Sequence, residues 1–467
     1  MQIPILNGIY TDNEPDFRTS YPVNLVPTSM SSGISAGYLR PADGIVKQGI
    51  GPGEDRGAIN WNGKHYRVMG SKLVYIDDDN VVQTIGDVGN DGGQVSIDYS
   101  FDRLAIASNK NLFYYDGTTL TQVTDPDLGT VLDVVWVDGY FMTTDGEFLV
   151  VTELSDPTQV NPLKYGSSEI DPDPVEALIK LKNEIYAINR YTIEVFDNIG
   201  GTLFPFQRID GAKIDKGAVG THACCVFVEA IAMVGSGRNE HPGVYLASNS
   251  QTVKLSTSEI DKQLNQFTEE QLSTIVVEHR KDKNAQLLYI HLPDRTLVYD
   301  AYSTQATGQP VWYVLSSAES GFSRYRARNF VWVYNKQFCG DPTSDNFGYI
   351  DDSISSHWGD TVGWEFGTTI IYAEGNNAIF HELELVALTG RIKQGVTPTI
   401  STSYSLDGIT YSPEVSIQAG TQGQRQKRLA WRRQGKMENW RIQRFKGTSD
   451  AHIAFARLEA QIEGLMY

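Results

Sequence analysis

Carboxylates and their spacing are the first features of this 467-residue chain that could carry chemistry. Hydrolysis of a glycoside needs two carboxyl groups that flank the scissile bond. Glu278 and Glu382 lie in strand-like segments, and the sequence identifies no second carboxylate for either of them. The chain also has no P-loop and no His-Glu-x-x-His motif, so these patterns indicate no nucleotide-binding or metalloprotease site.

One short segment resembles a glycosidase signature. Residues 405–411, SLDGITY, are similar to the Asp box of sialidase propellers, Ser-x-Asp-x-Gly-x-Thr-Trp. The segment is one residue shorter, occurs once, and has Tyr411 in place of the tryptophan. Asp-Gly between two alternating strands is also a strong signal for a hairpin turn. We therefore interpret Asp407 as a turn residue and expect no catalytic residue in this chain.

The candidate metal ligands are also sparse. His222 precedes Cys224 and Cys225, but a structural zinc site needs four convergent ligands. The acidic runs 77–79 and 171–174 could bind calcium, although acidic loop tips are more often simply solvated. We expect neither a metal nor a cofactor.

Positive charge gathers in one segment of an acidic chain. The formal net charge is −18, which disfavours a general affinity for nucleic acid or anionic membranes. Residues 425–447 carry about +8, so the remainder carries about −26. This segment is the candidate contact with another subunit or an acidic partner; a solvated sheet face and direct DNA binding stay open as alternatives. Its basic residues are Arg425, Lys427, Arg428, Arg432, Arg433, Lys436, Arg441, Arg444 and Lys446.

Cysteine usage and hydropathy indicate the compartment. The chain has three cysteines, including Cys339, and this odd number does not make a disulfide framework. Residues 1–17 lack both a basic and an apolar region of the kind found in a signal peptide, and no run approaches 18 apolar residues. We expect synthesis in the cytoplasm, reduced thiols and no membrane insertion.

A repeated unit of strands and tight turns organises the first three quarters of the chain. Asn62-Gly63 and Asp138-Gly139 are typical two-residue hairpin turns between strand-like runs. The second strand of each unit starts near residues 64, 103, 140, 184, 230, 285 and 336, at spacings of roughly 37 to 55 residues, as in four-stranded propeller blades. The sequence therefore predicts a β-propeller of six or seven blades, with residues 44–50 supplying the missing last strand.

The rest of the chain follows other patterns. Short helices are expected over 258–272, with Ser258 as N-cap and a capping box from Thr268 to Gln271. After about residue 360 the strands become longer and alternate, which favours an antiparallel β-sandwich. The fold class is all-β, and the expected domains are an extended N-terminal arm (1–43), the propeller (44–357) and the sandwich (358–467).

Several stretches together resemble a known family. The chain is similar to the tail nozzle or tail-hub proteins of short-tailed phages of Gram-negative bacteria, the packaged-DNA stabilisation family. The stretches occur in the family's order over nearly the whole chain; they are YPVNLVP (21–27), GYLRPADGI (37–45), YIHLPDRTLVYDA (289–301), FCGD (338–341), SYSLDGITYS (403–412) and KRLAWRRQG (427–435).

This resemblance implies a structural protein of the virion tail, made in the host bacterium. The family forms a six-copy ring below the portal and its adaptor, retains the packaged genome, carries a needle or plug, and helps to dock tailspikes or fibres. Double-stranded DNA would pass without sequence-specific contacts. We expect an acidic or neutral inner wall, because a basic wall would hold DNA by releasing counterions. The alternative is a glycan-degrading or glycan-binding propeller.

Overall fold

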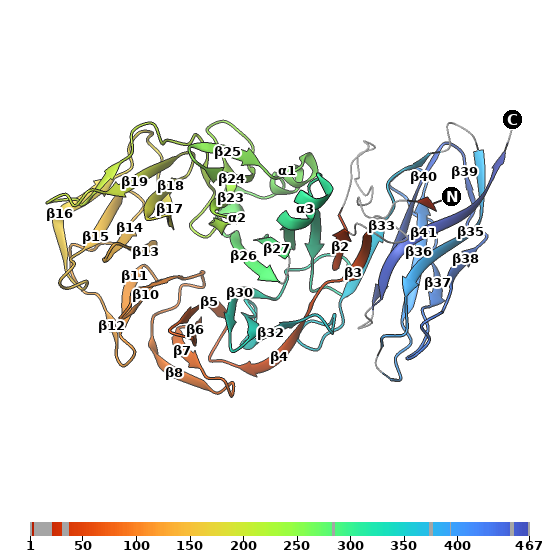
Figure 1. The fold of residues 1–467 in the computed structure, drawn as a ribbon, viewed down its shortest axis with the longest axis horizontal. Coiled ribbons are helices and arrows are strands. Elements are labelled where there is room, and N and C mark those ends of the chain that lie inside the picture. The colour runs from red at the N-terminus through yellow and green to blue at the C-terminus, as the bar shows by residue number, and fades with distance from the viewer. Residues whose placement is uncertain are drawn as a thin grey trace.

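Seven antiparallel sheets arranged in a ring and one β-sandwich beside them make up the fold (Figure 1). The computed structural model describes residues 2–3, 21–29, 37–282, 285–372, 377–392, 394–448 and 453–465. Within these ranges the predicted all-β plan, a propeller followed by a sandwich, is confirmed, and the blade number is seven. No helix in the described ranges is long and apolar enough to span a membrane.

Each blade is a sheet of four or five strands. Blade 1 consists of β5 (Asp55–Trp61), β6 (Lys64–Met69), β7 (Lys72–Ile76) and β8 (Val82–Asp87), and blade 2 of β9 (Ser96–Tyr99), β10 (Leu104–Ser108), β11 (Asn111–Tyr115) and β12 (Leu120–Gln122). Blade 3 consists of β13 (Asp133–Val137), β14 (Tyr140–Thr144), β15 (Phe148–Thr152) and β16 (Val160–Ser167). Blade 4 consists of β17 (Val175–Leu181), β18 (Glu184–Asn189), β19 (Ile193–Asn198) and β20 (Phe206–Arg208). Blade 5 consists of β21 (Gly217–Ala218), β22 (Cys224–Phe227), β23 (Ala230–Ser236), β24 (Gly243–Ser248) and β25 (Gln251–Lys254). Blade 6 consists of β26 (Val276–Asp282), β27 (Ala285–His291), β28 (Thr296–Asp300) and β29 (Trp312–Leu315). Blade 7 consists of β30 (Arg328–Val333), β31 (Lys336–Gly340), β32 (Asn346–Asp351) and β4 (Gly44–Ile50).

The hairpin turns fix the register of the blades. The second strands begin at residues 64, 104, 140, 184, 230, 285 and 336, in agreement with the predicted starts. Asn62 and Gly63 both adopt positive φ, 54° and 73°, as a two-residue turn between twisted strands requires. The apolar side chains of adjacent blades then pack together, for example Tyr66 and Val68 of blade 1 with Leu104 of blade 2.

An early strand closes the ring, as predicted. β4 pairs antiparallel with β32, with Ile45 opposite Ile350 and Ile50 opposite Asn346. The last blade is therefore completed by residues from the start of the propeller. This pairing protects the outer edge of β32 and links the two ends of the propeller chain.

Buried carboxylates connect the innermost strands of neighbouring blades. Asp98 of blade 2 accepts the N–H of Trp136 in blade 3 at 2.6 Å, and Asp133 of blade 3 accepts the N–H of Leu178 in blade 4 at 2.8 Å. Glu278 of blade 6 accepts two N–H groups from the innermost strand of blade 7, at 3.1 and 3.0 Å. These bonds satisfy backbone donors that the sheets leave unpaired at the ring axis.

A buried ion pair fixes blade 1 against blade 7. The Arg67 guanidinium donates to Asp55 at 2.5 Å, and both side chains are fully buried. The Asn329 side chain of blade 7 donates to the second oxygen of Asp55 at 2.6 Å, while Arg67 donates to the Asn329 carbonyl. Closure of the ring therefore rests on polar contacts as well as on the pairing of β4.

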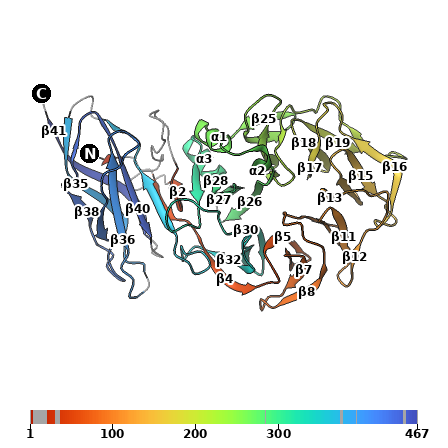
Figure 2. The ribbon, with the colours of Figure 1, turned by 180° about the vertical axis from the view of Figure 1, so that it is seen from behind.

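The sandwich contains two sheets, and the described N-terminal strands belong to one of them (Figures 1 and 2). Its core includes Trp364, Phe366, Phe380, Phe445 and Phe455. The first sheet comprises β1 (Gln2–Ile3), β2 (Leu25–Ser29), β3 (Gly37–Pro41), β35 (Asn377–Leu388), β38 (Leu429–Arg432), β39 (Lys436–Met437) and β41 (Ala454–Leu465). The second sheet comprises β33 (Gly363–Gly367), β34 (Ile371–Tyr372), β36 (Thr399–Ser405), β37 (Val415–Gln418) and β40 (Trp440–Thr448).

The helices lie in connections of the late blades. α1 (Ser258–Leu264) and α2 (Glu269–Ser273) link blades 5 and 6, and the predicted Thr268–Gln271 capping box is confirmed. The predicted N-cap was wrong by one residue, because Thr257 has the extended backbone and Ser258 already lies in the helix. α3 (Ala301–Thr307), which the sequence reasoning missed, begins where Asp300 accepts two backbone N–H groups.

A buried charge triad joins the start of the propeller to blade 6. Asp43 accepts from Arg40 and from Arg280, each at 2.6 Å, and Asp43 and Arg280 are buried. Burial alone would raise the pKa of Asp43, but the two guanidinium groups lower it to about 2. The carboxylate is therefore charged at neutral pH and compensates two cations.

We predict that Asp43→Asn destabilises the protein by about 3–5 kcal/mol, because it removes the buried counter-charge that Arg40 and Arg280 share and leaves Arg280 only the half-buried Asp282. Urea unfolding at pH 7 measures the change. Asp87→Asn is the control, since Asp87 pairs with Lys72 at the exposed surface and should matter far less. Equal shifts of the two midpoints would contradict the assignment.

The pH dependence of stability should report on Asp133. Burial raises the pKa of Asp133 to about 6, so the folded chain binds this proton more tightly than the unfolded chain does. Relative to Asp133→Asn, the wild-type free energy of unfolding should rise as the pH falls from about 6 to about 4. The pKa of Asp116 is lowered, so Asp116→Asn should give no such slope in this window. A flat difference for Asp133→Asn would refute the prediction.

Candidate functional site

The basic segment 425–447 occupies β38, β39 and β40, so its residues belong to both sheets of the sandwich. The structure divides its nine predicted contact residues into three groups. One residue is buried, five are paired with acidic neighbours, and three are exposed with no ion pair inside the described ranges. These groups differ in what they can offer a partner.

Arg441 is the buried member. Its guanidinium donates to the Gln434 carbonyl and to the Gln443 side chain, and it lies 4.3 and 3.9 Å from the ring centres of Phe380 and Tyr404. Burial lowers the pKa of Arg441 to about 10, which leaves it charged at neutral pH. Arg441 therefore stabilises the sandwich interior and is not available to a partner.

Arg428 and Arg432 are neutralised by a neighbouring strand. β38 pairs antiparallel with β35, which places Arg432 directly opposite Glu382. Arg428 contacts Glu382 at 3.0 Å and Glu384 at 2.6 Å, and its hydrogen bond lowers the pKa of Glu384. Glu382 thus has a partner that the sequence could not reveal, because the register of β35 and β38 brings together residues about 50 positions apart.

The remaining paired cations also have nearby acids. Lys436 contacts Glu438 at 2.6 Å, and Lys446 contacts Glu414. Arg444 is half-buried; its guanidinium lies 3.8 Å from the ring centre of Tyr411 and 4.0 Å from Glu365. Exposed pairs of this kind add little stability, but they reduce the net charge that a partner would meet.

Arg425, Lys427 and Arg433 are exposed, and none of them forms an ion pair with a described residue. Arg425 and Lys427 precede β38, whereas Arg433 follows it, so the open cations lie at the two ends of this strand. The extended basic strip of the sequence is therefore reduced to two separate positions. In the sequence, the alternating glutamates Glu382 and Glu384 of β35 are the feature that indicates acidic partners for some of these cations.

Asp407 lies in the hairpin connection between β36 and β37. One of its oxygens accepts the N–H groups of Ile409 and Thr410 at 2.8 and 2.7 Å, and the Thr410 hydroxyl donates to the other oxygen. These bonds hold the pKa of Asp407 well below its usual range. The carboxylate therefore stabilises a turn, as the sequence predicts.

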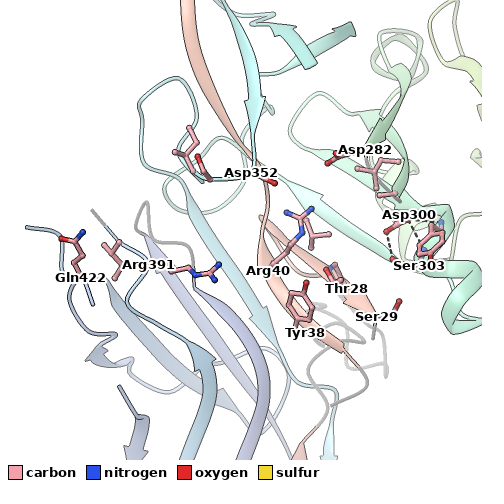
Figure 3. A pocket seen from close by; sticks show the side chains of 18 residues that line it. Thr28, Ser29, Tyr38, Arg40, Asp282, Asp300, Ser303, Asp352, Arg391 and Gln422 are labelled. Atoms are coloured by element: carbon pink, nitrogen blue, oxygen red, sulfur yellow. Dashed lines mark hydrogen bonds between the residues drawn. The ribbon is translucent and has the colours of Figure 1, made fainter. Parts of the chain in front are cut away.

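A cleft of about 1100 Å³ lies between the propeller and the sandwich (Figure 3). Arg40 and Tyr38 reach it from β3, Asp300 from the start of α3, and Arg391 from a sandwich loop. Arg40 is bound to Asp43, and Asp300 caps α3. Both of these side chains are therefore engaged in contacts within the chain.

A second cavity, of about 470 Å³, lies among the innermost strands of the propeller. Its lining includes Asp98, Asp133, His222 and Cys224. Burial lowers the pKa of His222 to about 4 and raises that of Cys224, so both are neutral at pH 7. Among the described residues no three His, Cys, Asp or Glu side chains are grouped to hold a metal ion.

Glu278 and His291 form the closest acid–base pair that sequence reasoning missed. The two side chains are 2.7 Å apart, and His291 also contacts the Thr296 hydroxyl at 2.9 Å. Burial would raise the pKa of Glu278, but its hydrogen bonds lower it overall. Both Glu278 oxygens also accept backbone N–H groups of blade 7, so this carboxylate joins two blades while His291 and Thr296 hold it within blade 6.

Two solved structures that the chain resembles have TM-scores below 0.5. The chain is similar to the WD40 domain of Neurospora crassa Pan2, with a TM-score of 0.43 and 10% identity over 70% of this chain and 98% of that chain. It is similar to the N-terminal domain of Nup159, with a TM-score of 0.41 and 9% identity over 71% of this chain and 100% of that chain.

Family and sequence comparisons cover both parts of the chain. The family described as bacteriophage P22 Gp10, beta-propeller, matches residues 1–355, and the family described as bacteriophage P22 Gp10, beta-sandwich, matches residues 363–463. The tail hub protein gp10 of Salmonella phage P22 is 29% identical over 460 residues, which is 93% of this chain and 94% of that protein. The chain therefore belongs to the bacteriophage P22 Gp10 family, with both the propeller and the sandwich of that family.

Proposed function

We propose that this chain is a structural protein of the virion tail in a short-tailed phage. It forms the hub or nozzle ring below the portal and adaptor, retains the packaged genome and guides its ejection. The observation that carries this proposal is the match of both units to the Gp10 family, together with a tail hub relative aligned over 93% of the chain.

The proposed ring contains six copies whose contacts join unlike surfaces. A heterologous contact generates a closed ring when the rotation between copies closes. Residues 44–357 and 358–467 would act as its two structural units, and the described strands of the arm 1–43 add to one sheet of the sandwich. The open cations Arg425, Lys427 and Arg433 would meet acidic surface of a neighbouring copy or tail protein, where charge complementarity fixes register.

The other proposed partners are the adaptor, a needle or plug, a tailspike or fibre, and passing double-stranded DNA. The net charge of −18 favours a channel that does not grip the genome. Retention would then depend on a plug that blocks the channel, and the DNA would slide once the plug leaves.

We predict that the triple change Arg425→Glu, Lys427→Glu and Arg433→Glu lowers incorporation into tails at least about tenfold, because it reverses the charge at the proposed contacts. The measurement is the copy number per tail, by quantitative mass spectrometry of purified particles. The control reverses Lys47, Lys110 and Lys281, three exposed propeller lysines, with the same change in net charge. Normal incorporation of the first variant would contradict the contact, and one or two copies in wild-type tails would refute the ring.

We propose further that the chain is not a glycosidase. The Asp407 carboxylate is engaged in its own turn, which supports this view. Purified protein should release no reducing sugar from capsule or lipopolysaccharide glycans, and Asp407→Ala should change nothing in that assay. Sustained glycan cleavage by the wild type that is lost in Asp407→Ala would favour the enzymatic alternative.

A further inference from the structure

Large apolar side chains are exposed on one face of blades 2 to 4. Phe101 is 90% exposed, Leu154 57% and Ile199 60%. Each follows the first or third strand of its blade, and these two strands run in the same direction in an antiparallel sheet. The connections that carry the three residues therefore emerge on the same face of the propeller.

The contacts between these connections make the surface continuous. The Phe101 ring packs edge-on against Trp136, with 5.6 Å between ring centres. Trp136 belongs to β13, which leads into the Asp138-Gly139 turn. The Leu154 side chain lies close to this turn, because a Cβ atom added to Gly139 would be 3.0 Å from the Leu154 Cδ2 atom.

The same turn extends the surface to blade 4. Asp138 accepts a hydrogen bond from Asn198 at 3.2 Å, and Ile199 is the next residue along the chain. We name Phe101, Trp136, Leu154 and Ile199 the apolar arc. Exposed apolar residues that occur singly need no explanation, but a contiguous group indicates an interaction surface.

Three acidic residues and one lysine lie beside the apolar arc, and the lysine, Lys180, has its Nζ atom 4.7 Å from the centre of the Trp136 ring. Asp138, Asp156 and Asp197 are exposed and form no ion pair with a described residue. The blade that carries Leu154 lies at the end of the propeller away from the sandwich, and the blade that carries Ile199 is next to it (Figure 1). The apolar arc is therefore far from the open cations of the same chain and cannot pair with them.

A surface of complementary chemistry exists on the sandwich. Leu388 is 62% exposed at the end of β35. The Thr389 hydroxyl donates to the Gln424 carbonyl at 2.7 Å, which holds Leu388 near the open cations Arg425 and Lys427. We name Leu388, Arg425 and Lys427 the sandwich patch. It combines an exposed apolar side chain with positive charge, whereas the apolar arc combines exposed apolar side chains with negative charge.

We propose that the apolar arc of one copy binds the sandwich patch of a second copy of this chain. Burial of Phe101, Leu154 and Ile199 would supply affinity, and Arg425 and Lys427 opposite Asp138, Asp156 and Asp197 would set the register. Because the two surfaces lie at opposite ends of the molecule, the contact is head-to-tail and repeats from copy to copy. This inference deepens the proposed ring and rests on it.

The first test removes the apolar arc without touching the core. Phe101→Ser, Leu154→Ser and Ile199→Ser are combined in the full chain, and native mass spectrometry measures the fraction of protein in rings. We expect a loss of about tenfold or more, as when one hot spot of an interface is truncated. The control combines Ile50→Ser, Leu163→Ser and Val253→Ser, which are exposed apolar residues elsewhere, and should assemble as the wild type does.

The second test mixes two defective chains. The arc variant retains its sandwich patch, whereas a variant with Arg425→Glu, Lys427→Glu and Leu388→Ser retains its apolar arc. Each should be monomeric alone, and an equal mixture should form pairs that stop at two copies, because only one productive contact remains. Circular dichroism and thermal unfolding establish that both variants are folded.

The outcomes separate this inference from the ring itself. Wild-type rings with an arc variant that assembles normally would overturn the apolar arc while leaving the ring intact. Folded variants that form no pairs when mixed would overturn the pairing of these two surfaces. Wild-type protein that never forms rings, in solution or in purified tails, would overturn the proposed function instead.

Discussion

The unpaired edge of each innermost strand is the constraint on which the propeller depends. Such a strand has a sheet neighbour on one side only, so its N–H groups at the axis must find acceptors elsewhere. Asp98, Asp133 and Glu278 provide them by reaching from one blade to the next. The same bonds set the relative position of adjacent blades in the ring, which β4 closes by pairing with β32 of the last blade.

This arrangement also determines where charge is found. Acidic side chains at the axis are buried, and burial raises the pKa of Asp133 to about 6. In the sandwich, the register of β35 and β38 places Glu382 beside Arg428 and Arg432. A segment with about eight surplus positive charges in the sequence therefore presents only a few open cations at the surface.

Local sequence patterns made much of the fold predictable, but they did not predict which strands pair within the sandwich. Hairpin turns such as Asn62-Gly63 specify strand starts within a few residues, which is why the blade repeat could be predicted. The partner of Glu382 depends on a register that no local pattern encodes. α3 was missed although Asp300 and Gly308 are typical start and stop residues, because strand-like residues on either side dominate that segment.

The proposed head-to-tail contact explains how an acidic chain could surround DNA without gripping it. Cations that line a channel would bind phosphates and release counterions, which slows a passing duplex. Arg425 and Lys427, bound to the apolar arc of a neighbouring copy, would be covered by protein and withheld from the channel. Within one chain, the glutamates that pair with Arg428 and Arg432 also withhold these cations from DNA. Assembly of the ring and free passage of the genome would then depend on the same few ion pairs.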